Sequence, residues 1–183
     1  MTLTPFEILK FYENKEIDKK NASKLVISLI EDSDDDDLFE EGIEILEKIA
    51  WKNEAVYRFL ENVLISDSNI NARNAAFYAL KAIFPERICN PLTHLVEYDN
   101  SFLFINFIEH LTEIDLKKCK EALIKRIKRE RNTISNLIFS YDDFFEIEDL
   151  SKIKIERLIG MYKEFFYYKC VNSLFYRRID SID

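Results

Sequence analysis

The feature that most constrains the fold is a pair of apolar series that recurs about every 34 residues. The first series is Leu9, Ile43, Phe77 and Ile108, and the second lies three residues later, at Tyr12, Leu46, Leu80 and Leu111. Both series advance in steps of 34, 34 and 31 residues. Apolar residues three apart share one face of a helix, and a period of this size indicates units that bury their apolar faces against their neighbours. The chain is therefore predicted to be a row of similar supersecondary units.

The units are predicted to be pairs of helices. The chain has only two glycines and three prolines, which is too few for the turns of an all-β fold. Residues that favour helix N-caps precede apolar stripes with three- and four-residue spacing. The helices expected from these signals cover approximately residues 5–13, 18–31, 37–50, 53–64, 70–84, 90–98, 104–114, 115–131, 133–147 and 151–177, the last with an interruption at Gly160.

The clearest copy of the unit lies between Asn69 and Asp99, with Pro85 and Pro91 at the corner between its two helices. Its first helix carries Arg73, Ala76, Phe77, Ala79, Leu80 and Ile83, and Asp67 precedes it. In these residues the chain resembles the HEAT and armadillo group of α-helical repeats, over roughly residues 4–131. Two other copies depart from the pattern, because their positions equivalent to Arg73 hold Phe39 and Phe104.

The resemblance implies an all-α superhelix (an α-solenoid) of about four helical hairpins. It would form a single domain over residues 1–183, in which residues 132–183 are an aromatic-rich helical cap. A plain helical bundle is the alternative fold. Members of the HEAT and armadillo group mostly hold other proteins, and a minority bind nucleic acid or modify a ligand. The resemblance therefore implies a non-catalytic scaffold or adaptor, although a fold does not fix a function.

Acidic and basic residues are concentrated in separate stretches. The formal net charge is −8 and the pI is about 5.0. Residues 31–54 carry eleven acidic residues against Lys48 and Lys52, a local balance of −9. Residues 117–131 carry eight basic residues against Glu121 and Glu130, a local balance of +6. Because an acidic chain is repelled by nucleic acid and by anionic membranes, the charge argues against both, and the expected partner is the protein that the resemblance implies.

The basic stretch is the first candidate binding site. Its basic residues are expected to lie opposite an apolar stripe. The basic face comprises Lys117, Lys118, Lys125, Arg126, Lys128 and Arg129, and the apolar stripe comprises Leu116, Cys119, Leu123, Ile124 and Ile127. An ordinary amphipathic surface helix has the same pattern. The functional interpretations are contact with an acidic protein segment, with phosphate or nucleic acid, or with the acidic region 32–47 of another copy.

Second helices of the repeat are expected to form the binding surface together. The predicted contact residues on them are Arg58, Asn62, Thr93, Glu97, Lys118, Lys125, Arg126 and Arg129. The main competing function is a nucleic-acid-binding or DNA-repair module that uses the basic helix 117–131. Alkylation-repair glycosylases hold DNA with HEAT-like stacks, but they depend on a broadly basic concave face.

Aromatic residues near the C-terminus form the second candidate site. Seven rings fall between Met161 and Tyr176, more than one buried helical stripe accommodates. The structural interpretation is a capping helix that closes the end of the stack. The functional interpretation is an exposed aromatic patch that docks a partner, with Tyr162, Phe166 and Tyr167 as its predicted contact residues.

Catalytic and cofactor motifs are not found in the sequence. The two histidines, His94 and His110, have no neighbouring metal-ligand spacing and are interpreted as packing residues. The two glycines, Gly42 and Gly160, form no phosphate-binding loop. Neither an enzyme nor a cofactor is expected.

The acidic run 32–37 does not match the calcium-binding loop of an EF-hand. Counting from Asp32, the positions that require glycine and glutamate hold Asp37 and Ile43. The run is therefore interpreted as a solvated linker that caps a helix, and no metal site is expected.

Location and assembly are predicted from composition. Three cysteines without paired spacing are typical of a reducing compartment. The N-terminus lacks the pattern of a signal peptide, and the longest apolar runs are too short to span a membrane. The chain is expected to be cytoplasmic, and monomeric or weakly self-associating.

Overall fold

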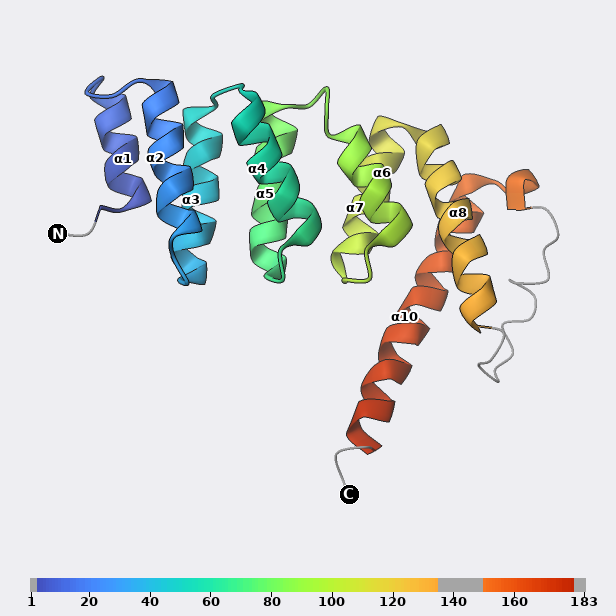
Figure 1. Cartoon of the computed structure of the whole chain (residues 1–183). Helices are drawn as coiled ribbons and strands as arrows, with labels where there is room; N and C mark the ends of the chain where they lie inside the picture. Colours follow the sequence, from blue (N-terminus) through green and yellow to red (C-terminus); the bar gives the residue numbers. More distant parts are fainter. Residues whose placement is uncertain (1–2, 135–149, 180–183) are drawn as a thin grey trace. The chain divides into compact units, whose positions relative to one another are not determined.

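A computed structural model describes residues 3–134 and 150–179, with side chains over 3–130 and 150–167. These residues form helices joined by short connections, with no strand among them (Figure 1). The helices are α1 (Pro5–Glu13), α2 (Lys19–Glu31), α3 (Asp36–Ile49), α4 (Glu54–Ser66), α5 (Ile70–Ile83), α6 (Cys89–Tyr98), α7 (Leu103–Ile114), α8 (Leu116–Ile134), the 3-10 helix η1 (Leu150–Lys152) and α10 (Ile155–Ile179). The all-α prediction is confirmed for this part of the chain.

Side-chain caps fix most of the predicted helix starts. Thr4 and Glu7 form the predicted capping box, in which the Glu7 amide donates to Thr4 Oγ1 and the Thr4 amide donates to Glu7 Oε2. Asp18 caps α2 and Asn53 caps α4, as their positions predicted. Helix α3 begins at Asp36, one residue earlier than expected, because the Asp35 carboxylate accepts from two amides of its first turn.

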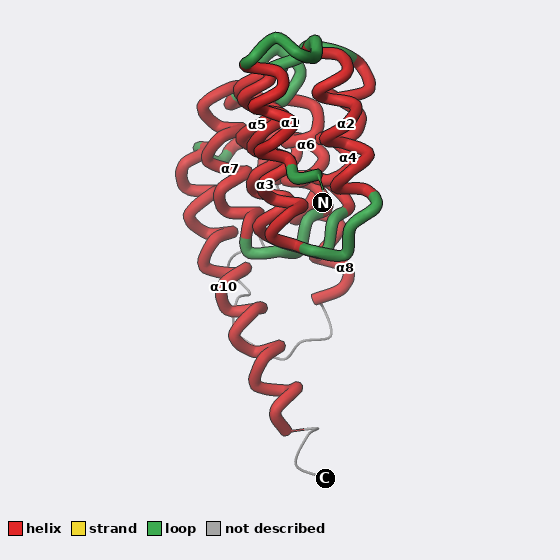
Figure 2. The backbone as a smooth tube through the Cα atoms, turned by 90° about the vertical axis from the view of Figure 1, so that its left-hand side faces the viewer, coloured by secondary structure: helices red, strands yellow, loops and turns green. Residues whose placement is uncertain are grey.

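The chain divides within α6 into two compact units, Met1–Pro91 and Leu92–Asp183, and each is described by itself. In the first unit α3 packs against α1 and α5, α2 packs against α1 and α3, and α4 packs against α5. Figure 2 shows α1, α3 and α5 in one layer and α2 and α4 in the other.

The two recurring apolar series supply much of this packing. In the first unit the buried members are Leu9, Ile43, Leu46, Phe77 and Leu80, and in the second unit they are Ile108 and Leu111. Tyr12 is the remaining member and is half-buried. The periodic positions of the sequence are therefore mostly core positions, and they lie on alternate helices: α1, α3, α5 and α7.

Arg73 ties the start of α5 to the end of α4. Its Nε donates to the carbonyl oxygen of Leu64 at 2.8 Å, and the side chain is buried. The last carbonyls of a helix lack intrahelical donors and carry negative partial charge. A buried guanidinium at this position satisfies one of them and links two consecutive helices.

In the second unit α8 packs against α7 and α10. Helix α10 runs through Gly160 without the predicted interruption. This glycine is exposed, and a Cβ built on it meets no atom within 4 Å, so it marks neither a kink nor a close approach. Residues 133 and 134 of the helix predicted over 133–147 belong to the end of α8, and 135–149 lie outside the described residues.

Within residues 3–134 and 150–179, every helix is too short or too polar to cross a membrane.

Candidate binding face on α6 and α8

Helix α8 has the predicted buried stripe, but the burial of two residues differs from the prediction. Cys119 and Leu123 are buried as expected, whereas Leu116 is 48% exposed and Arg126 is fully buried. Arg126 follows Leu123 by three residues and Cys119 by seven, so helical geometry places it in the apolar stripe. Leu116 is the first residue of α8, and helical side chains point back towards the N-terminus. It therefore extends past the packed part of the helix.

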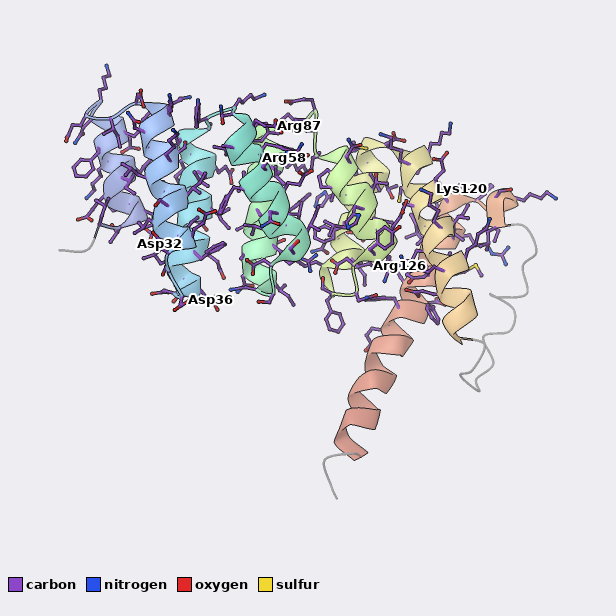
Figure 3. The ribbon with its side chains drawn as sticks, in the orientation of Figure 1. Asp32, Asp36, Arg58, Arg87, Lys120 and Arg126 are labelled. Atoms are coloured by element: carbon purple, nitrogen blue, oxygen red, sulfur yellow. The ribbon has the colours of Figure 1, made fainter. Side chains whose placement is uncertain are left out.

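The Arg126 guanidinium caps the C-terminal end of α6 (Figure 3). Its Nη1 donates to the carbonyl oxygens of Val96, at 3.3 Å, and of Asp99. Its Nη2 donates to Asn100 Oδ1 at 3.0 Å. The two carbonyl oxygens lie at the end of α6, where a helix has unpaired carbonyls and a negative dipole end, so the backbone partly compensates the charge of the buried cation.

The same guanidinium binds α10 through a tyrosine. Arg126 Nε donates to the Tyr162 hydroxyl at 2.6 Å, and that hydroxyl donates to Glu130 Oε2 at 2.7 Å. Glu130 also forms an ion pair with Arg126 at 3.2 Å, and the Phe104 ring lies 4.1 Å from the guanidinium carbon. Burial raises the pKa of the Tyr162 hydroxyl far above its usual value. Tyr162 therefore stays protonated and bridges a buried cation and a buried anion.

The predicted aromatic contact residues lie on both sides of α10. Tyr162 and Phe166 are buried, with the Phe166 ring centroid 5.1 Å from that of Phe104. Tyr167 is 66% exposed. Arg126, Tyr162 and Phe166 thus belong to the interior of the second unit, and of these predicted contacts only Tyr167 lies on the surface. The side chains of the remaining aromatic residues from 168 onward lie outside the described ones.

The other predicted cations do form an exposed stripe. Lys118, Lys125 and Arg129 are exposed, and their seven- and four-residue spacing places them on one side of α8. That side lies next to α6, because Lys125 Nζ donates to Glu97 Oε1 at 2.8 Å and the Arg129 guanidinium carbon lies 4.6 Å from the Tyr98 ring centroid. We call the surface formed by Lys118, Lys125, Arg129 and Tyr98, together with the largely buried Glu97 that pairs with Lys125, the α6–α8 face.

A comparison of the chain with protein-family models, curated proteins and solved structures finds no match.

The charge on the α6–α8 face is positive and only partly compensated. The hydrogen bond that Lys125 donates to Glu97 raises the pKa of the Lys125 ammonium, which therefore stays charged at neutral pH. Lys117 and Lys128 are exposed beside the stripe, and Glu121 lies 4.0 Å from Lys117. Tyr98 is 52% exposed and stacks against His94 as well as against Arg129, with a ring-centroid distance of 4.8 Å to His94. The face therefore combines point charges with a flat aromatic surface.

The second-helix residues predicted in the first unit are differently placed. Arg58 forms ion pairs with Glu54 at 2.8 Å and with Glu61 at 2.9 Å. Arg87 Nη1 also donates to Glu54 Oε2 at 2.7 Å, and Figure 3 labels Arg87 close to Arg58. Asn62 is exposed. Arg58 is thus matched by two carboxylates of its own helix.

Among the described residues, no group of three or more His, Cys, Asp or Glu side chains is placed to hold a metal ion. His110 Nδ1 lies 3.5 Å from Glu113 Oε2, on the next turn of α7. Of the described cysteines, Cys119 is buried, and burial raises the pKa of its thiol.

Sequence reasoning missed two parts of the surface. Tyr98 was not predicted as part of the face. It lies four residues after His94, at the end of α6, where its exposed ring is available to a cation of α8. A cleft between α3 and α5 was also not predicted. It is lined by Asn71, Asn74 and Tyr78, whose spacing of three and four residues indicates one face of α5.

Proposed function

We propose that this chain is a HEAT-like helical-repeat protein, with about four helical hairpins and a C-terminal helical cap. Two observations support the proposal. The recurring apolar positions are mostly core positions of alternate helices, and α1, α3 and α5 form one layer of the first unit, as the first helices of a repeat would.

The function that the geometry supports best is non-catalytic protein binding in the cytoplasm, by a scaffold whose α6–α8 face takes an acidic segment of another protein. The observation that carries it is the exposed stripe of Lys118, Lys125 and Arg129 beside the exposed Tyr98 ring. Carboxylates of the partner would pair with the three cations, and its apolar atoms would cover the tyrosine. Rings and arginines of this kind are enriched where proteins bind each other.

Electrostatics favour an acidic protein over nucleic acid. Glu97 is buried and paired with Lys125, and Glu121 is exposed beside the cationic stripe, so the stripe presents a short run of positive charge rather than the continuous track that a phosphate backbone follows. The whole chain carries −8, and this long-range field repels a polyanion more strongly than a short acidic segment. Nucleic-acid binding through the basic helix 117–131 is the competing function.

A binding experiment separates the two classes. Fluorescence anisotropy would compare a labelled polyglutamate peptide, a DNA duplex and a single-stranded RNA, each titrated with the full chain. We expect the peptide to bind at ~20 mM salt and to be released by ~150 mM, because exposed charges are screened over a Debye length of about 8 Å. Tighter binding of DNA or RNA than of the peptide would instead establish the competing function. Absence of binding by all three ligands at low salt would overturn the proposal.

A further inference from the structure

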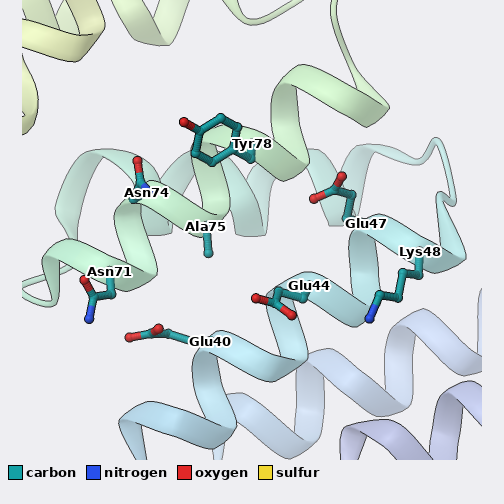
Figure 4. Close-up of a pocket in the computed structure, with 8 residues that line it drawn as sticks. All are labelled: Glu40, Glu44, Glu47, Lys48, Asn71, Asn74, Ala75 and Tyr78. Atoms are coloured by element: carbon teal, nitrogen blue, oxygen red, sulfur yellow. The ribbon is translucent and has the colours of Figure 1, made fainter.

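An acidic cleft lies on the first unit, between α3 and α5 (Figure 4). It has a volume of about 440 Å³. One wall is formed by three glutamates of α3, and the other by two amides, a tyrosine and an alanine of α5. The lining residues are Glu40, Glu44, Glu47, Lys48, Asn71, Asn74, Ala75 and Tyr78.

The carboxylates of this cleft are not neutralised by the protein itself. In the part of the chain that the structure describes, no ion pair joins Glu40, Glu44 or Glu47 to a basic side chain. Lys48 is the one cation in the lining of this cleft. The unit that holds the cleft has eighteen acidic and eleven basic residues, a net of −7. Its field therefore attracts a cationic partner.

The spacing of the cleft matches that of a cationic helix. Glu40 and Glu47 are seven residues apart on α3, and Asn71 and Tyr78 are seven residues apart on α5. At 1.5 Å per residue, each row is about 10 Å long. Lys118 and Lys125 of α8 are also seven residues apart and lie on one side of their helix. Laid along the cleft, the two cations would each meet a carboxylate at one of its ends.

We infer that the acidic cleft binds the α6–α8 face of a second copy of this chain. In this contact Lys118, Lys125 and Arg129 of one molecule pair with Glu40, Glu44 and Glu47 of the next. Ala75 is the smallest side chain in the cleft and leaves room for α8 of the second copy. The half-exposed Tyr78 ring covers the aliphatic parts of the lysine side chains on that helix. The inference rests on the proposed function, since it names the acidic partner of the same cationic face.

The contact is heterologous, because the two surfaces that meet are different. After one contact forms, one molecule still has its cleft available and the other still has its α6–α8 face available, so association continues from copy to copy unless the rotation closes a ring. The pairs are exposed, and exposed ion pairs are weak and screened by salt. Self-association is therefore expected at high protein concentration and low salt, and is lost at high salt.

Two charge-neutralised variants test the contact by sedimentation velocity at ~20 mM salt. The cleft variant carries Glu40→Gln, Glu44→Gln and Glu47→Gln, and the face variant carries Lys118→Gln, Lys125→Gln and Arg129→Gln. We expect the unsubstituted chain to form concentration-dependent assemblies and each variant alone to stay monomeric. A mixture of the two variants should form a 1:1 dimer and nothing larger, because only one complementary pair of surfaces remains.

The outcomes separate this inference from the proposed function. A monomeric unsubstituted chain at every concentration, or a mixture that stays monomeric, would overturn the self-contact. If the self-contact is overturned but polyglutamate peptide still binds the cleft variant and not the face variant, the proposed function stands without the self-contact. If the peptide binds neither the variants nor the unsubstituted chain, both proposals are wrong.

Discussion

Replacing Arg126 by alanine is expected to destabilise the second unit by about 3–5 kcal/mol, the usual cost of removing one partner of a buried ion pair. The substitution leaves the Glu130 carboxylate buried without its cation and removes the donors to the carbonyls at the end of α6. It also removes the donor to Tyr162 of α10. One side chain thus holds three helices of this unit together.

Urea unfolding of the full chain, followed by far-ultraviolet circular dichroism, measures this effect. The matched control is Lys128→Ala, an exposed cation of the same helix, which should change the free energy of unfolding by less than about 0.5 kcal/mol. Tyr162→Phe keeps the ring and removes only the bridging hydroxyl, so it should cost about 1–3 kcal/mol. A loss below about 1 kcal/mol for Arg126→Ala would show that the guanidinium is solvated rather than buried.

Alanine at the two glycines should have effects of opposite sign. A Cβ at Gly42 would lie 2.2 Å from Cγ2 of Ile30, a fully buried side chain on the neighbouring helix α2. Gly42→Ala is therefore expected to cost about 1–3 kcal/mol through overpacking. At Gly160 a Cβ meets no atom within 4 Å, and alanine should stabilise α10 by up to about 1 kcal/mol through its higher helix propensity.

The same unfolding measurement checks the pair of glycine variants. A double-mutant cycle with Ile30→Ala identifies the cause, since removing the Ile30 methyl groups should relieve most of the cost of Gly42→Ala. Additive effects of the two substitutions would show that α2 and α3 do not approach as closely as described. A destabilising Gly160→Ala would contradict the open surroundings of that glycine.

The local structure could be predicted because its causes are local. Thr4, Asp18 and Asn53 accept hydrogen bonds from amides two or three residues away, so a short stretch of sequence contains both partners. The recurring apolar positions were likewise identified from spacing, since residues at nearly equal steps occupy equivalent faces of alternate helices. For these features the sequence pattern and the packing have the same physical origin.

The burial of Arg126 could not be predicted in this way. Its acceptors lie 26–30 residues earlier, and Tyr162 lies 36 residues later, so no local pattern shows that a charge at this position is satisfied. The spacing of Arg126 from Cys119 and Leu123 is that of the apolar stripe, so its assignment to the basic face was wrong, but this spacing does not identify its partners. The burial of Tyr162 and Phe166 could not be predicted for the same reason, because both rings belong to the cluster around Phe104 that encloses the guanidinium.

The most direct test of the proposed binding face compares two variants with the same net charge. The face variant neutralises Lys118, Lys125 and Arg129 on α8. The matched control neutralises Lys19, Lys20 and Lys24, three exposed lysines of α2. Both substitutions to glutamine change the net charge from −8 to −11, so any difference between them reports the position of the cations and not the total charge.

The measurement is the dissociation constant of the labelled polyglutamate peptide at low salt for the two variants. Three exposed ion pairs contribute roughly 0.2–1 kcal/mol each, so the face variant should bind about ten-fold more weakly than the control variant. Equal dissociation constants for the two variants would contradict the account, because they would place the binding site away from the α6–α8 face.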